Sequence, residues 1–135
     1  MRIVGWAEAM YAAIDAASER KFAWGSHDCC LFAADILLAM TGTDYAEPVR
    51  GYTTQEEAQA IIDGYGEMEI MVTALVGLDA LEAKGKNVRR GDLVLMTKEL
   101  GDTMGVCIGA NSVFVDHRGI AMCRTASCRL AWRID

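Results

Sequence analysis

The sequence predicts an α+β domain in which N-terminal helices pack on one face of a C-terminal antiparallel sheet. Apolar residues recur at helical spacing through the first half of the chain. The second half consists instead of short apolar runs separated by turns that contain glycine. The length of 135 residues suits one hydrophobic core. We therefore expect a single domain over residues 1–135.

The first two helices are expected over residues 3–20 and 28–41. The first carries apolar residues at helical spacing and many alanines. The second begins at Asp28 or Ser26 as its N-cap and ends before Gly42. It is apolar on nearly every face, so we expect it to be the central buried helix.

Shorter elements are expected after residue 50. Thr54 begins a segment close to a capping box, which predicts a short helix ending near Gly64. Residues 67–76 are a candidate fourth helix, and residues 79–90 are polar. Apolar runs bounded by turn residues then predict strands. These strands are expected over residues 92–96, 103–108, 112–116, 120–123 and 130–134.

Charge and composition exclude several classes of function. A formal net charge of -6 and an isoelectric point near 4.9 argue against binding to nucleic acid or to anionic membranes. No segment reaches the roughly 20 apolar residues of a membrane-spanning helix. Glu8 and Asp15 interrupt any signal-peptide core, so we expect synthesis and folding in a cytoplasm, without membrane insertion. The five cysteines are an odd number, and free thiols are expected.

Cys29 is the candidate nucleophile of the chain. It lies in the first turn of the second expected helix, where unpaired N–H groups and the helix dipole stabilise a thiolate. The alternative is that Cys29 only fills space, since cysteine is among the most buried residue types. The Cys-x2-Cys spacings typical of zinc and iron–sulfur sites are absent, so we expect no metal and no cofactor.

Three motifs resemble the NlpC family of papain-like cysteine endopeptidases. Asp28-Cys29 opens an apolar helix, residues 90–95 read Arg-Gly-Asp-Leu-Val-Leu, and residues 105–109 read Gly-Val-Cys-Ile-Gly. The resemblance covers residues 24 to about 117 and implies a papain-like NlpC-type fold for the single domain. It also implies that Cys29 holds the nucleophile position and that Thr103 occupies the position of the catalytic histidine. The third polar position falls near Val115 to His117, and His117 is the candidate for it.

The resemblance predicts a scaffold whose catalytic base is missing. Threonine cannot act as a base near neutral pH, so Thr103 implies a pseudoenzyme. The alternative is an active cysteine endopeptidase that cleaves peptidoglycan cross-links, with Cys29 as nucleophile and His117 as its partner. His27 lies two residues before Cys29. Both histidines are also explained as solvent-exposed or hydrogen-bonded residues without a catalytic role.

A second resemblance covers almost the whole chain. Residues 24–35 contain Trp-Gly-x-His-Asp-Cys, residues 50–52 read Arg-Gly-Tyr, and residues 128–133 read Cys-Arg-Leu-Ala-Trp-Arg. These motifs resemble a small phage family, a domain of unknown function encoded among the tail genes of siphophages, prophages and gene-transfer agents. The resemblance implies a structural protein of the tail tip or of tail assembly. Its partners would be distal tail, hub and tail-fibre-type subunits, and it would reside in the virion tail after synthesis in the bacterial host cytoplasm.

The candidates for contact with such partners are Trp132, Arg133, Arg129 and Arg50. Tryptophan and arginine are frequent anchors of protein interfaces. The alternatives are that Trp132 packs back on the sheet and that the arginines are ordinary surface charges, worth under about 1 kcal/mol each. A further hypothesis for Cys29 is a module that binds through its thiol or carries an acyl group on it.

Overall fold

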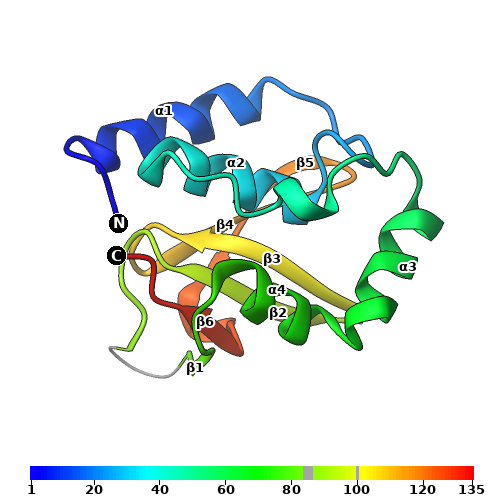
Figure 1. The fold of residues 1–135 in the computed structure, drawn as a ribbon. Coiled ribbons are helices and arrows are strands. Elements are labelled where there is room, and N and C mark those ends of the chain that lie inside the picture. Colours follow the sequence, from blue (N-terminus) through cyan, green and yellow to red (C-terminus); the bar gives the residue numbers. More distant parts are fainter. Residues whose placement is uncertain (84–86, 100) are drawn as a thin grey trace.

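The protein is an α+β domain, as the sequence predicts, with helices in its N-terminal part and an antiparallel sheet in its C-terminal part (Figure 1). The computed structural model describes residues 1–83, 87–99 and 101–135. Within these ranges the sheet has six strands in the order β1-β6-β2-β3-β4-β5. Every neighbouring pair of strands is antiparallel.

All four expected helices form, and one is shorter than expected. They are α1 (Trp6–Ser18), α2 (Cys29–Thr41), α3 (Gln55–Tyr65) and α4 (Met68–Val76), with a 3-10 turn η1 (Glu47–Val49) before α3. α1 starts later than residue 3 because Gly5 adopts a left-handed conformation, with φ 78°, at its N-cap. No helix in the described ranges is long and apolar enough to cross a membrane.

The central buried helix is α2, as expected. Figure 1 shows it beside α1 over the sheet, and seven of its residues are buried. The Asp28 side chain caps its start by accepting a hydrogen bond from the N–H of Leu31. Gly42 ends it in the left-handed conformation, with φ 81°. Both predicted caps are confirmed, with Asp28 and not Ser26 at the N-cap.

The strands expected after residue 91 are also present. They are β2 (Leu93–Lys98), β3 (Gly101–Cys107), β4 (Asn111–Asp116), β5 (Gly119–Arg124) and β6 (Leu130–Trp132), with a 3-10 turn η3 (Thr125–Ser127) before β6. A short strand β1 (Leu81–Glu82) pairs with β6. Sequence reasoning missed β1 because two residues are too few to show a period. Within the polar segment 79–90, residues 84–86 lie outside the described residues.

Buried clusters lie on both faces of the sheet. Leu93 and Leu95 face the main core beneath the helices, whereas the alternating residues Val94 and Met96 face a second cluster. The second cluster is completed by Ala83, Val88 and Cys128, from the connecting segments after β1 and before β6. The helices therefore cover one face, as expected, and connecting segments close part of the other.

The two ends of the chain meet beside the sheet (Figure 1). Arg2 donates a hydrogen bond from Nε to the carbonyl of Ile134 at 2.5 Å, and its guanidinium lies 3.5 Å from the buried carboxylate of Asp92. Arg133 approaches the same carboxylate, with Nε 3.3 Å from Oδ2. Asp92 therefore joins Arg2 and Arg133, near the two ends of the chain, to the start of β2.

Candidate functional site

Cys29 is the first residue of α2 and lies against β3. Its side chain is partly buried, and interactions with the hydroxyl of Thr103 and the backbone N–H of Met104 on β3 lower the pKa of its thiol. The resemblance to the NlpC family assigns the position of a catalytic base to Thr103. The structure brings Thr103 and Cys29 together, although the two residues are far apart in the chain.

The carboxylate of Asp28 holds the start of α2 in place. It is fully buried, and both of its oxygens accept hydrogen bonds. Oδ1 accepts from the N–H of Leu31 at 3.0 Å, and Oδ2 accepts from the N–H of Gly25 at 3.0 Å and from the hydroxyl of Tyr52 at 2.5 Å. These donors compensate the burial of the charge and tie the 25–28 turn and the segment before α3 to the helix that carries Cys29.

The turn before α2 requires glycine at position 25. Gly25 has φ 81°, and a Cβ atom built on it would lie 1.9 Å from the carbonyl oxygen of Tyr52. A side chain is therefore excluded both by backbone conformation and by contact. The close approach of the two backbone segments is what allows the Tyr52 hydroxyl to reach Asp28.

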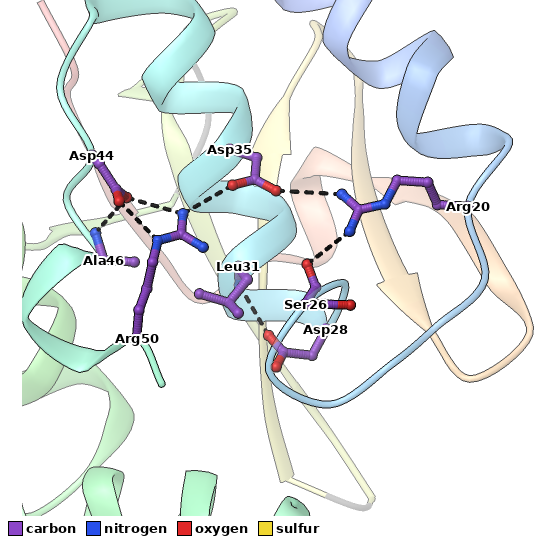
Figure 2. A network of polar contacts seen from close by, with 8 residues as sticks. All are labelled: Arg20, Ser26, Asp28, Leu31, Asp35, Asp44, Ala46 and Arg50. Atoms are coloured by element: carbon purple, nitrogen blue, oxygen red, sulfur yellow. Dashed lines mark hydrogen bonds and ion pairs between the residues drawn. The ribbon is translucent and has the colours of Figure 1, made fainter. Parts of the chain in front are cut away.

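A chain of four charged side chains ties the surrounding loops together. In Figure 2, Asp35 on α2 lies between the guanidinium groups of Arg20 and Arg50. Arg50 also makes two hydrogen bonds to the carboxylate of Asp44, at 2.8 and 3.0 Å. Arg20 donates to the carbonyl of Ser26 at 3.1 Å. The network thus joins the end of α1, the middle of α2 and the loop around η1 beside the candidate site.

The thiol of Cys29 is set up to ionise near neutral pH. The hydrogen bond between Cys29 and Cys30, whose sulfurs lie 3.9 Å apart, is the main cause that lowers the pKa of Cys29 to about 7. Met104 and Thr103 act in the same direction, while burial and the charge of Asp28 oppose them. The same hydrogen bond and burial raise the pKa of Cys30. Cys29 is therefore the thiol of the pair that ionises first.

Neither histidine joins this site in the structure. His117 lies in the exposed turn between β4 and β5, and no hydrogen bond or ion pair links it to Cys29 within the described residues. His27 is buried with its ring against Phe32, at 6.0 Å between ring centroids. Among the described residues, neither of its ring nitrogens has a partner at hydrogen-bonding distance and angle. The predicted pairing of Cys29 with His117 is not assembled here.

Cys29 and Cys30 border a cavity of about 180 Å³ between α2, α3, α4 and the sheet. Its walls are mostly apolar, and its polar lining includes Tyr52, Gln55 and Asp102. Sequence reasoning missed this cavity because its walls come from separate elements, and no local pattern marks such a space. The apolar part of the lining includes Leu37, Ile61, Ile62, Met71, Val72 and Leu75.

The prediction that Trp132 anchors a partner is wrong. Its side chain is fully buried in the main core, and its indole N–H donates to the hydroxyl of Thr73 on α4 at 3.1 Å. The indole therefore has no surface to offer to another protein. The alternative, that Trp132 packs back on the sheet, is what the structure shows.

The three arginine candidates are engaged within the chain. Arg50 pairs with Asp35 and Asp44 as described, and Arg133 contacts Asp92 and the carbonyl of Asn87. Arg129 lies 3.6 Å from the carboxylates of both Glu69 and Asp102 and donates to Thr97. Their side chains keep some exposure, so contact with a partner stays a prediction for them.

The described residues contain no group of three or more histidine, cysteine, aspartate or glutamate side chains arranged to hold a metal ion. The cysteines within these ranges are free thiols.

The fold and site define an α+β domain that carries an ionisable cysteine at a helix N-terminus, next to an apolar cavity, and within the described residues no hydrogen bond links a histidine to this cysteine. Residues 1–134 match the family model described as a domain of unknown function, DUF6950, and the chain belongs to that family. No curated protein matches the chain.

Proposed function

We propose that the chain is a structural component of a bacteriophage or prophage tail tip, or of its assembly, built on an inactive papain-like NlpC-type scaffold. The observation that carries the proposal is that Thr103, at the position that the resemblance assigns to a base, is the β3 side chain that acts on the thiol of Cys29. The motifs that resemble phage tail proteins support the assignment to a tail. The partners would be distal tail, hub and tail-fibre-type subunits, in the virion.

Peptide hydrolysis requires proton transfers that this site does not provide. A cysteine peptidase needs a group that protonates the leaving amine and then activates water. A threonine hydroxyl does neither near neutral pH, and no histidine of the described residues contacts Cys29. The thiol is thus retained on a scaffold that lacks the rest of the catalytic apparatus.

A genetic experiment tests this proposal in a phage or prophage that encodes the chain. We expect deletion of the gene to prevent formation of infectious tails, and the Cys29→Ser variant to restore them, because contacts and not catalysis are required. Mass spectrometry of purified tails should detect the chain. The proposal fails if the deletion leaves tail assembly and infection unchanged.

An active endopeptidase is the second candidate, favoured by the lowered pKa of Cys29, about 7, and by the adjoining cavity. Digestion of purified peptidoglycan, followed by chromatography of the released muropeptides, tests it directly. We expect no cleavage of cross-links by the unaltered protein. Cleavage that disappears in both Cys29→Ala and His117→Ala variants would establish the enzyme and overturn the first proposal.

A further inference from the structure

The environment of Cys29 favours a nucleophile that reacts without a base. The sulfur of Cys30 lies 3.9 Å from that of Cys29 on α2, and Thr103 and Met104 act on the thiol from β3. Because these groups are held by the fold and lower the pKa of the thiol to about 7, much of it is ionised at neutral pH before any substrate arrives. Such a thiol needs no neighbouring histidine to remove its proton.

The same environment restricts which acyl compounds can react. Attack on an amide expels an amine, which must be protonated as it leaves, and the site offers no histidine to do so. Attack on a thioester expels a thiolate, whose conjugate acid has a pKa of about 8.5, so it departs unassisted. Of the common acyl donors, thioesters therefore match the chemistry of this site.

The site also has no histidine among the described residues that would remove an acyl group once attached. Hydrolysis of an acyl-cysteine is accelerated by a base that activates water, and Thr103 cannot act as one. The acyl group would therefore remain on the sulfur as a stable modification. This distinguishes an acceptor site from the active centre of an acyltransferase or peptidase.

The cavity next to Cys29 accounts for the chemical class of the acyl group. Aliphatic and methionine side chains from α2, α3 and α4 form most of its wall, Leu37, Ile61, Met71 and Leu75 among them. No lysine or arginine is among its lining residues in the described part of the chain. An aliphatic chain gains free energy on entering such a space, whereas a charged group loses its hydration there.

We propose that Cys29 is an acceptor for an aliphatic acyl group delivered as a thioester, with the chain held in the cavity between α2, α3 and α4. The thiolate sulfur of Cys29 attacks the carbonyl carbon and forms a new carbon–sulfur bond. The bond from that carbon to the carrier sulfur breaks, and the carrier leaves as a thiolate that takes a proton from water. No atom changes its oxidation state. This inference does not depend on the assignment to a phage tail.

The purified protein incubated with octanoyl coenzyme A tests the inference. We expect intact-mass spectrometry to show the addition of one octanoyl group, peptide mapping to place it on Cys29, and neutral hydroxylamine to remove it. The Cys29→Ala variant should stay unmodified at that position. The inference is overturned if the unaltered protein remains unmodified, or if the label is found on the partly exposed Cys123 instead.

Two variants test the roles of the cavity and of Thr103. Ala58 on α3 lines the cavity and is half-buried, so Ala58→Leu should slow octanoyl transfer several-fold and leave acetyl transfer from acetyl coenzyme A unchanged. Thr103→His restores a base beside the sulfur and should shorten the lifetime of the adduct at least about tenfold. Equal slowing of both acyl donors by Ala58→Leu would refute the role of the cavity. Far-ultraviolet circular dichroism checks the fold of each variant.

Discussion

At the scale of single residues, the environments of three side chains near the start of α2 determine which charges the site stabilises. Asp28 is buried with a full set of donors, the groups around Cys29 lower the pKa of its thiol, and His27 is buried where loss of solvent lowers the pKa of its ring. The first two arrangements stabilise negative charge, whereas the third disfavours positive charge. The site is therefore organised for a carboxylate and a thiolate and against an imidazolium ion.

Replacing Thr103 by Val should make Cys29 less reactive. The variant removes one hydroxyl donor from the sulfur, so the pKa of Cys29 rises and its thiolate fraction at neutral pH falls. Alkylation by iodoacetamide, followed residue by residue with mass spectrometry, should slow several-fold at Cys29. The matched variant Thr103→Ser retains the hydroxyl and should react at the original rate. Equal rates for all three proteins would show that the hydroxyl does not act on the sulfur.

His27 should make the protein less stable as the pH falls. Burial lowers its pKa, with Arg20 acting in the same direction against the weaker opposing effects of Asp35 and Asp28. Between the lowered pKa and the unfolded-state value of about 6.5, the unfolded chain binds more protons than the folded one. The contribution of His27 is therefore complete above that window and is lost as the pH falls through it.

Urea unfolding measured from about pH 8 down to about pH 5 checks this expectation. The unaltered protein should lose stability over this range, and a His27→Phe variant should lose less, because it has no imidazole to charge. The acidic groups with lowered pKa values, such as Asp44 and Asp116, titrate at lower pH and do not mask the effect. If the free energy of unfolding fell equally with pH in the two proteins, protonation of His27 would not destabilise the fold.

At the scale of elements, the site depends on how α2 begins. The helix start is fixed by its cap, by the turn at Gly25 and by the segment that carries Tyr52, and these three lie at different places in the chain. The charge network of Arg20, Asp35, Arg50 and Asp44 supports the same loops from outside. Exposed ion pairs contribute little individually, so the buried cap is expected to dominate.

Gly25 and Gly42 form a matched pair for testing this. Both have φ 81°, but a Cβ atom at Gly25 would overlap the Tyr52 backbone, whereas nothing lies within 4 Å of one at Gly42. Gly42→Ala should cost about 1 kcal/mol of unfolding free energy, the price of a left-handed alanine. Gly25→Ala should cost about 3 kcal/mol or more, because two backbone segments must also separate. Chemical denaturation measures both, and similar losses would mean that the turn adjusts freely.

At the scale of the whole molecule, the sheet has one face under the helices and the other partly closed by connecting segments, with the chain ends joined at Asp92. Trp132 is central to the main core although it lies three residues from the C-terminus. The last strand therefore belongs to the core, and loss of its anchor affects the whole fold. An assembly defect in a Trp132→Ala phage would reflect unfolding and would say nothing about partners.

Trp132→Ala should destabilise the domain by about 3–5 kcal/mol, the usual cost of truncating a buried large aromatic side chain. Trp132→Phe keeps much of the packing and loses the hydrogen bond to Thr73, so it should cost less. Thermal unfolding followed by circular dichroism compares the variants. A change within about 0.5 kcal/mol for Trp132→Ala would contradict the placement of this residue in the core.

Much of the fold was open to prediction because its signals are local. The cap at Asp28, the stop at Gly42 and the helix beginning after Thr54 each follow from a few neighbouring residues, and the structure confirms them. β1 was missed because it is two residues long, and its pairing with β6 is a long-range contact. The burial of Trp132 was likewise an open alternative, since a tryptophan near a chain end serves equally well in a core or at an interface.

The sequence by itself determined the order and type of the main elements and the position of Cys29 at the start of a buried helix. The signals for these elements are hydrophobic periodicity, helix caps and turn residues. Each depends on residues close together in the sequence, so it can be recognised in the sequence alone. Only the tertiary structure decided that Thr103 meets the thiol, that both histidines stay out of the site, and that an apolar cavity adjoins it. These features arise where α2, α3, α4 and β3 converge, and contacts between distant segments leave no periodic trace in a single sequence.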